Sequence, residues 1–502
     1  MRAQERIDEK VNAAIREEGF ARSRVFETAR MISDGFGPRI AGSPGFKAAA
    51  TYARSRLTEF GARNAAFEPW GKRGLGWELQ RFSVELTAPS YLRVTAVPKA
   101  WSRPLVGTVS GSPLVAEIRS AKDFDAWRGK LRGRILMLGR VPNAADTVPR
   151  FSAGARRFTD SQLDSMARLT EPGEPKDYWD DSDGFTEALA AQERVRKFLR
   201  EEGVVATIEA SRNELTIAVA GYDAYSSPTT SNLPAFVVDR SHYRRILAQL
   251  DRGAPVTLEL SLRARFPLDD STGFNIVAEI PGTDPALKDE VVMVGGHFDS
   301  WHAGSGATDN AAGSAVAIEV LRILNAIGAR PRRTIRVALW DGEEVEDYFG
   351  SMGYVKKHFG DPLTMHLMPE HAKLSAYFNV DNGTGRVRGL YLQGHEAVRP
   401  IFAAMLEPFR DLAATTLTIA RHGSTDHMPF VSVGLPGFEV IQDPIDYEPR
   451  THHTGLDDSG FLLEEDLKQA SVVVASLVYH TAMRDTMLPR PALPKPKSLP
   501  KP

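Results

Sequence analysis

The fold class is decided by the stretch EVVMVGGHFDSWHAGSGATDNAAGSAVAIEVLRILNAIGA, residues 290–329. It begins with a short apolar run that carries few charges, which is typical of a strand buried in a parallel sheet. It ends with a run whose apolar residues recur at helical spacing. The polar loop between them contains His297, Asp299 and Asp309, and Asp309 and Asn310 stand where helix-capping residues belong. The stretch therefore predicts a strand, a polar loop and a helix, with imidazole and carboxylate groups at the carboxyl end of the strand.

The same alternation continues toward the end of the chain. Three further strands are predicted by the apolar runs TIRVALW (334–340), LSAYFNVD (374–381) and GFEVIQD (437–443). A long closing helix is predicted by LEEDLKQASVVVASLVYHTAM (463–483). Strands that alternate with helices of this length predict an α/β fold with a mostly parallel sheet flanked by helices.

The region 81–270 has a different texture, with many short β-rich segments and two helical ones. We therefore expect an inserted β-rich domain at 81–270, between an N-terminal part of the main domain (1–80) and its larger part (271–486). An acidic segment at 165–184 is predicted to be a surface loop. The tail, 487–502, is rich in Pro and Lys and is expected to be extended and unpacked.

Composition excludes several classes of function. The 502 residues have a formal net charge of −2, which offers no electrostatic basis for binding nucleic acid. No apolar run approaches the length of about 18 residues that a membrane span needs. The first ten residues, MRAQERIDEK, contain no apolar signal segment. With no cysteines, thiolate nucleophiles and Cys-ligated zinc are excluded, so any zinc would bind His, Asp and Glu.

Polar residues of the kind that bind zinc cluster at the predicted strand ends. Ligands in open α/β sheets bind beyond the carboxyl ends of the strands. Two zinc ions about 3.5–4 Å apart can share one carboxylate and one hydroxide, and Asp309 would be the shared carboxylate. Three carboxylates and a hydroxide would balance the charge of two zinc ions, which makes burial of the cluster less costly. The residues concerned are His297, Asp299, Asp309, Glu343, Glu344, Asp381, His452 and His453.

The adjacent Glu343 and Glu344 would point to opposite faces of a regular strand. Both can approach one metal centre only where the chain turns, and Gly342 permits a turn. One glutamate would then bind metal, and the other would accept a proton from the attacking water. Asp299 would hold the second ring nitrogen of His297, and Asp457 could do the same for His453.

These residues lie in motifs that resemble metallopeptidase family 28. The motifs are GGHFDSWHAGSGATDNAAG, LWDGEEVEDYFGS, NVDNGTG, GSTDHMPFVSVGLPGFEVIQDP and THHTGLDD, which extend from 295 to 458, together with GPRIAGSPG at 37–45. The resemblance, nearest to the carboxypeptidase Q-like branch, implies a phosphorylase/hydrolase-like fold. Residues 81–270 resemble a protease-associated domain.

Residue by residue, the resemblance implies a ligand set for two zinc ions. One ion would be held by His297, Asp309 and Asp381, and the other by Asp309, Glu344 and His453. Glu343 would be the general base, and Asp299 would complete the catalytic set. In this family the ligand histidine directly precedes Ser or Thr, which favours His453 over His452.

The function implied is that of a zinc exopeptidase, either an aminopeptidase or a carboxypeptidase Q-like enzyme, acting on short peptides or dipeptides. A hydroxide that bridges the two zinc ions would be the nucleophile. The resemblance also implies a possible homodimer and a periplasmic or secreted location.

Two alternatives come from other classes. The fold could serve a single-zinc amidohydrolase or a glutaminyl cyclase-like enzyme, although the complete ligand set argues against one zinc. It could also serve a receptor-like binding protein, but such proteins have lost metal ligands and none is missing here. His302 and His422 are interpreted as loop residues, and Arg39 and Ser43 as residues that fix a turn near the site. His427 would either contact substrate or make a structural hydrogen bond.

Overall fold

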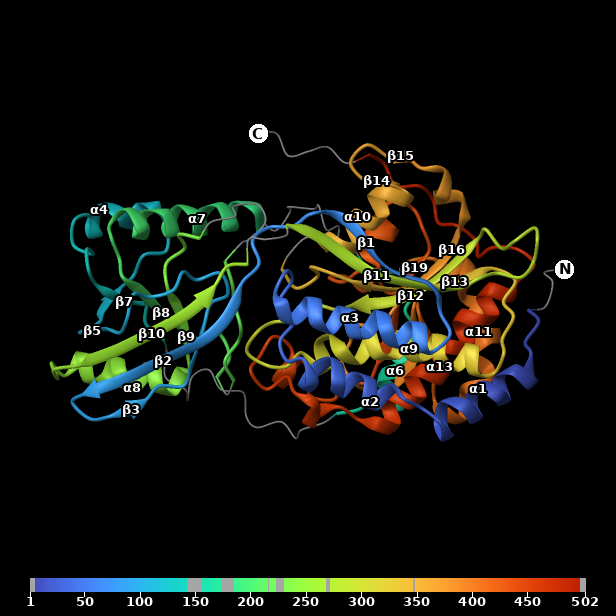
Figure 1. Ribbon diagram of the computed structural model, residues 1–502, viewed down its shortest axis with the longest axis horizontal. Coiled ribbons are helices and arrows are strands. Elements are labelled where there is room, and N and C mark those ends of the chain that lie inside the picture. Colours follow the sequence, from blue (N-terminus) through green and yellow to red (C-terminus); the bar gives the residue numbers. More distant parts are fainter. Residues whose placement is uncertain are drawn as a thin grey trace.

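The computed structural model describes residues 5–141, 156–173, 185–214, 216–222, 230–267, 271–345 and 348–496. These residues form two lobes that lie side by side (Figure 1). The chain passes from the larger lobe to the smaller one after β1 (Arg63–Lys72) and returns at β11 (Thr272–Ile280).

The larger lobe is built on an eight-stranded sheet with the order β1-β11-β13-β12-β16-β19-β17-β18. The four central strands run parallel, and antiparallel pairs occur at β1–β11, β11–β13 and β17–β19. The predicted mostly parallel α/β fold is thus confirmed. The remaining strands of the sheet are β12 (Val291–His297), β13 (Thr334–Trp340), β16 (Leu374–Asn379), β17 (Val387–Tyr391), β18 (Thr416–Thr418) and β19 (Gly437–Gln442).

Helices cover both faces of this sheet because its central strands are apolar on both sides. One face packs against α9, α13 and the N-terminal helices α1, α2 and α3 (Figure 1). Of these, α9 and α13 are buried along most of their length. The other face packs against α10 and α12 through a second apolar cluster. The helices of this lobe are α1 (Glu9–Ala21), α2 (Val25–Arg30), α3 (Pro44–Glu59), α9 (Ala312–Ala326), α10 (Phe349–His358), α11 (Arg399–Leu406), α12 (Met428–Ser432) and α13 (Glu464–Met483).

In the described residues, the smaller lobe contains two sheets and three α-helices. An antiparallel sheet has the order β3-β2-β10-β5, and a mixed sheet has the order β4-β9-β8-β7-β6. Their apolar faces share one core. The strands are β2 (Glu78–Ala88), β3 (Leu92–Arg93), β4 (Ala96–Pro98), β5 (Val109–Gly111), β6 (Leu114–Ala116), β7 (Ile135–Leu138), β8 (Ala206–Ala210), β9 (Ala235–Val238) and β10 (Thr257–Arg265); the helices are α4 (Phe124–Trp127), α7 (Phe185–Glu201) and α8 (Arg240–Asp251).

One segment of the expected insertion lies on the larger lobe instead. Residues 156–173 include α6 (Asp160–Ala167), which packs against β18. Arg157 forms ion pairs with Asp443 and Asp466 at 3.0 and 2.6 Å. The predicted acidic surface loop, 165–184, therefore begins inside a helix, while its residues 174–184 lie outside the described residues.

The tail also departs from its prediction. Residues 497–502 lie outside the described part, but the earlier residues pack against the larger lobe. Leu488 is buried in its core, and Arg490 donates a hydrogen bond to the carbonyl oxygen of Leu374 at 2.7 Å. A leucine and an arginine with buried partners thus anchor a segment whose Pro and Lys content suggested no packing. Among the described residues, no helix is both long and apolar enough to cross a membrane.

Candidate metal centre

The carboxyl ends of four parallel strands bring the predicted residues together. His297 is the last residue of β12, and Asp381 follows β16 by two residues. Glu343 and Glu344 follow β13, and the two histidines follow a helical turn, η8 (Tyr447–Thr451), that comes after β19. Since parallel strands end at one edge of the sheet, side chains far apart in sequence meet there.

Glycines allow the chain to approach this edge closely. A Cβ atom on Gly296 would lie 2.7 Å from the carbonyl oxygen of Val380, and one on Gly313 would lie 1.9 Å from the same oxygen. The start of α9 can therefore sit directly against the end of β16. The Asn310 side chain accepts a hydrogen bond from the Gly313 amide in the first turn of α9 at 2.8 Å, which leaves the Asp309 carboxylate free for other partners.

The first ligand group contains His297, Asp309 and Asp381, whose candidate ligand atoms all lie within 4.8 Å of one another. His297 Nε2 is 3.1 Å from Asp309 Oδ1 and 3.2 Å from Asp381 Oδ1. All three side chains are buried. One imidazole and two carboxylates are a donor set that suits catalytic zinc.

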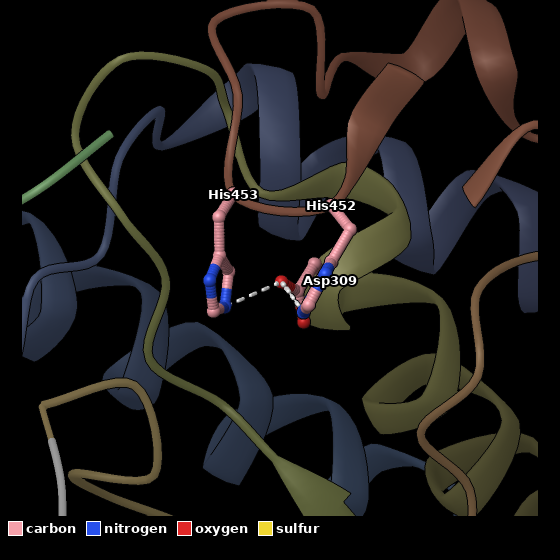
Figure 2. Close-up of side chains that lie close together, drawn as sticks. All are labelled: Asp309, His452 and His453. Carbon is pink, nitrogen blue, oxygen red and sulfur yellow. Dashed lines mark ion pairs between the residues drawn. The ribbon is translucent and has the colours of Figure 1, made fainter. Parts of the chain in front are cut away.

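The second group contains Asp309, His452 and His453 (Figure 2). Both histidines lie close to Asp309 Oδ2, with His453 Nε2 at 3.4 Å and His452 Nε2 at 4.0 Å. Glu344 Oε2 is 2.8 Å from His453 Nε2, whereas His452 Nδ1 is 3.3 Å from Glu448. Glu344 is thus placed beside His453, as the resemblance implies. The other ring nitrogen of His452 instead lies beside Glu448, which is exposed.

The centre has an excess of buried negative charge. Burial raises the pKa of Glu344 well above its usual value, and the charge of Asp309 raises it further. Burial would also raise the pKa of Asp309, but the hydrogen bond from His297 and the nearby His453 outweigh it and hold that pKa low. Such crowding of carboxylates is costly in a protein interior unless a cation compensates it.

The oxygen atoms themselves fit a cation. Asp309 Oδ2, Glu344 Oε2 and Asp381 Oδ1 are buried and have no hydrogen-bond partner among the described residues. Each lies within 2.8–3.4 Å of a histidine nitrogen without hydrogen-bond geometry. Buried oxygen atoms without donors, next to imidazole nitrogens, are what a metal site presents.

Asp299 lies beside the ring nitrogen of His297 that it was predicted to hold. The ring Nδ1 of His297 lies 3.1 Å from the backbone oxygen of Asp299 and 3.7 Å from its carboxylate, so the backbone holds this histidine. The Asp299 carboxylate also accepts hydrogen bonds from the backbone amides of Glu343 and Glu344, at 3.2 and 3.3 Å. The turn that carries both glutamates begins at Gly342, which has a φ of 79°. Asp299 therefore orients the paired glutamates.

Asp457 was predicted to hold a ring nitrogen of His453, but its carboxylate forms hydrogen bonds with backbone amides. Its carboxylate accepts hydrogen bonds from the amides of Thr308 and Asp309, at 2.7 and 3.1 Å. Burial raises the pKa of Asp457 to about 7, and the charge of Asp309 contributes to the rise. Asp457 thus positions the shared carboxylate through its main chain.

Two buried acids near the centre were not predicted. Glu439, in the middle of β19, accepts hydrogen bonds from the Asp381 amide at 3.0 Å and from Asn379 Nδ2 at 2.6 Å. Asp426 is fully buried, and burial raises its pKa to about 8, although the charge of His297 opposes the rise. A charged residue inside the apolar run GFEVIQ is the signal that could have revealed Glu439.

The remaining candidates have structural partners. His302 Nε2 lies 2.7 Å from the carbonyl oxygen of Pro98, and His427 Nε2 lies 2.9 Å from Gln393 Nε2. Arg39 is fully buried and donates to the carbonyl oxygens of Phe298, Ser305 and Gly306, at 2.7–2.8 Å. Ser43 caps α3. These residues hold the frame of the site and do not belong to either ligand group.

A mostly parallel sheet whose carboxyl edge carries two His–carboxylate groups with one shared aspartate defines a metal-dependent hydrolase. Residues 275–478 match peptidase family M28. This region is therefore a domain of that family, as its motifs suggested, and the chain is a metallopeptidase.

Similar proteins extend beyond the matched region. Human carboxypeptidase Q is 26% identical over 480 residues, which cover 94% of this chain and 88% of that protein. A peptidase M28 precursor from Shewanella amazonensis has a similar structure, with a TM-score of 0.66 and 22% identity over 97% of this chain and 98% of that one. A zinc aminopeptidase from Bacillus subtilis has a TM-score of 0.59 and 19% identity over 92% and 95% of the two chains. These structures share the fold of both lobes with this chain.

Proposed function

We propose that this protein is an exopeptidase that uses two zinc ions to hydrolyse short peptides or dipeptides. The observation that carries the proposal is the pair of ligand groups that share Asp309. One group would consist of His297, Asp309 and Asp381, and the other of Asp309, Glu344 and His453. Zinc bound there would supply a Lewis acid for the scissile carbonyl and an activated water.

Glu343 is proposed as the general base. Its neighbour Glu344 faces His453, while Glu343 remains partly exposed and its amide is held by Asp299. Burial raises the pKa of Glu343 well above its usual value. A carboxylate with a raised pKa is a stronger base. Glu343 would take a proton from the attacking water and pass it to the leaving amine.

Names of similar proteins support exopeptidase action, since they include a carboxypeptidase and a zinc aminopeptidase. We extend that kind of reaction to this chain as part of the proposal. The homodimer, the periplasmic or secreted location and the protease-associated type of the smaller lobe also remain predictions.

The test is the number of zinc ions per chain, measured by elemental analysis in the wild type, in Asp309→Ala and in Asp289→Ala. Asp289 is an exposed aspartate two residues before β12 and serves as the control. We expect about two zinc ions in the wild type and the control, and a sharp fall in Asp309→Ala, because both ions lose the shared ligand. One zinc ion per chain, unchanged by Asp309→Ala, would contradict the proposal and favour a single-zinc enzyme.

A further inference from the structure

One segment of the smaller lobe lies beside the metal centre. Residues 216–222 run beside the loop that carries the ligand histidines: Ala218 pairs with Thr454 in an antiparallel bridge, and the Val219 amide donates to the His453 carbonyl oxygen at 2.8 Å. Gly221 lies under two tryptophans, since a Cβ atom there would be 3.0 Å from Trp301 and 3.1 Å from Trp101. The two lobes are therefore in direct contact at the site.

Arg212 lies just before this segment in the chain. The Ser211 hydroxyl accepts a hydrogen bond from the Ala218 amide at 3.0 Å and donates one to the Thr216 carbonyl oxygen at 2.8 Å. These hydrogen bonds place Ser211 against Ala218, which pairs with Thr454. Arg212 follows Ser211 directly, so its backbone lies near the loop that carries His453.

The guanidinium of Arg212 is available to a ligand. Its side chain is exposed, and no hydrogen bond or ion pair of it occurs within the described ranges. Glu214, the acid nearest to it in sequence, is held by Arg240 at 2.8 Å and by Arg244 at 2.6 Å. Arg39, in contrast, is buried and occupied by backbone carbonyls.

The side chain of Arg212 lies near the metal centre. Its guanidinium is close enough to the ring of His453 for the two side chains to interact electrostatically. The proposed zinc ligands are carboxylates and imidazoles, so they offer a substrate no positively charged side chain such as that of Arg or Lys. A substrate carboxylate next to these acids would be repelled unless a cation received it.

We propose that Arg212 binds the free α-carboxylate of the substrate and so selects short peptides with an unblocked carboxyl terminus. The inference rests on the proposed peptidase function and assigns the smaller lobe a part in specificity. Arg212 would act on substrate binding and not on the chemical step, so its loss should raise KM while kcat changes little.

The test compares three substrates: alanyl-alanine, alanyl-alanine amide and alanyl-glutamic acid α-amide. We expect the wild type to prefer the first. Arg212→Ala should raise KM for alanyl-alanine about tenfold or more, because a charge-assisted hydrogen bond is lost, and should leave both amides nearly unchanged. Arg212→Lys should retain much of the preference, and Arg212→Glu should lose more than Arg212→Ala does.

Controls separate this proposal from the peptidase function itself. Arg245→Ala, an exposed arginine on α8 of the same lobe, should change none of the three substrates. Zinc content and Tm establish that each variant is folded, and Arg212→Gln replaces any variant that is not. If Arg212→Ala raised KM equally for all three substrates, or only for alanyl-glutamic acid α-amide, the role of Arg212 would be overturned. If the wild type hydrolysed none of the peptides, the peptidase function would fail instead.

Discussion

Neighbouring residues in this site differ because their surroundings differ. Glu343 and Glu344 share one turn and one amide-binding aspartate, Asp299. Glu344 is buried beside His453, whereas Glu343 is partly exposed. The same side chain can therefore serve as a metal ligand at one position and as a base at the next.

Replacing Glu343 with Gln should separate these two roles. The amide keeps the shape of the side chain but cannot accept a proton, so kcat should fall about 10²- to 10⁴-fold while zinc content stays at the wild-type level. Steady-state kinetics and elemental analysis would measure both. A variant that keeps more than about a tenth of the wild-type rate would remove Glu343 from the mechanism.

The histidine pair gives a second prediction at this scale. His453 lies beside Glu344, while a ring nitrogen of His452 forms an ion pair with the exposed Glu448. His453→Ala should therefore lower zinc content and activity together, and His452→Ala should keep most of the zinc. The reverse pattern of zinc contents would make His452 the ligand.

At the scale of elements, the loop after β12 depends on one buried arginine. Arg39 comes from the N-terminal part of the chain, yet its guanidinium binds three carbonyl oxygens in residues 298–306. Burial lowers the pKa of Arg39 to about 10, although nearby acids, Asp457 first, oppose this. The segment 37–45 thus fixes the loop that leads from His297 to Asp309.

Arg39→Met should leave these carbonyl oxygens without donors. Each lost partner costs roughly 1–3 kcal/mol, so the free energy of unfolding should fall by about 3–5 kcal/mol. Denaturant unfolding measures this change, with the exposed Arg245→Met as the control, for which less than about 0.5 kcal/mol is expected. A loss below about 1 kcal/mol would show that the loop holds its shape without Arg39.

At the scale of the whole molecule, a charged cluster joins the edge strand β1 to α10. Glu68 lies 2.8 Å from Lys357 Nζ and 2.5 Å from His358 Nε2. Burial would raise the pKa of Glu68, but these two partners outweigh it and lower the pKa to about 2. The pair fastens a strand near the start of the chain to a helix almost 300 residues later.

Glu68 should therefore make stability depend on pH in the acid range. Because its pKa is lower in the folded state, its contribution is fully present above its ordinary value of about 4.5 and is lost as the pH falls toward 2. Glu68→Gln should lower Tm at pH 7 and bring a smaller change at pH 3.5, where part of the contribution is already lost. A difference in Tm that is equal at both pH values would show that the ionised pair adds no stability.

The sequence by itself determined the alternation of strands and helices, the mostly parallel sheet and the residues at its carboxyl edge. Hydrophobic periodicity and turn residues are local signals, and they can be read without knowledge of distant contacts. His297, Asp309, Asp381, Glu344 and His453 stand at predicted strand ends or loops, so the edge of one sheet brings them together.

Only the tertiary structure decided what the surrounding residues hold. The carboxylates of Asp299 and Asp457 accept hydrogen bonds from backbone amides, and Glu439 supports Asp381 from inside a strand. The packed tail and the contact between Val219 and His453 also join residues more than a hundred positions apart. Such contacts depend on which hydrogen-bond partner lies nearest after folding, and spacing along the chain does not encode that distance.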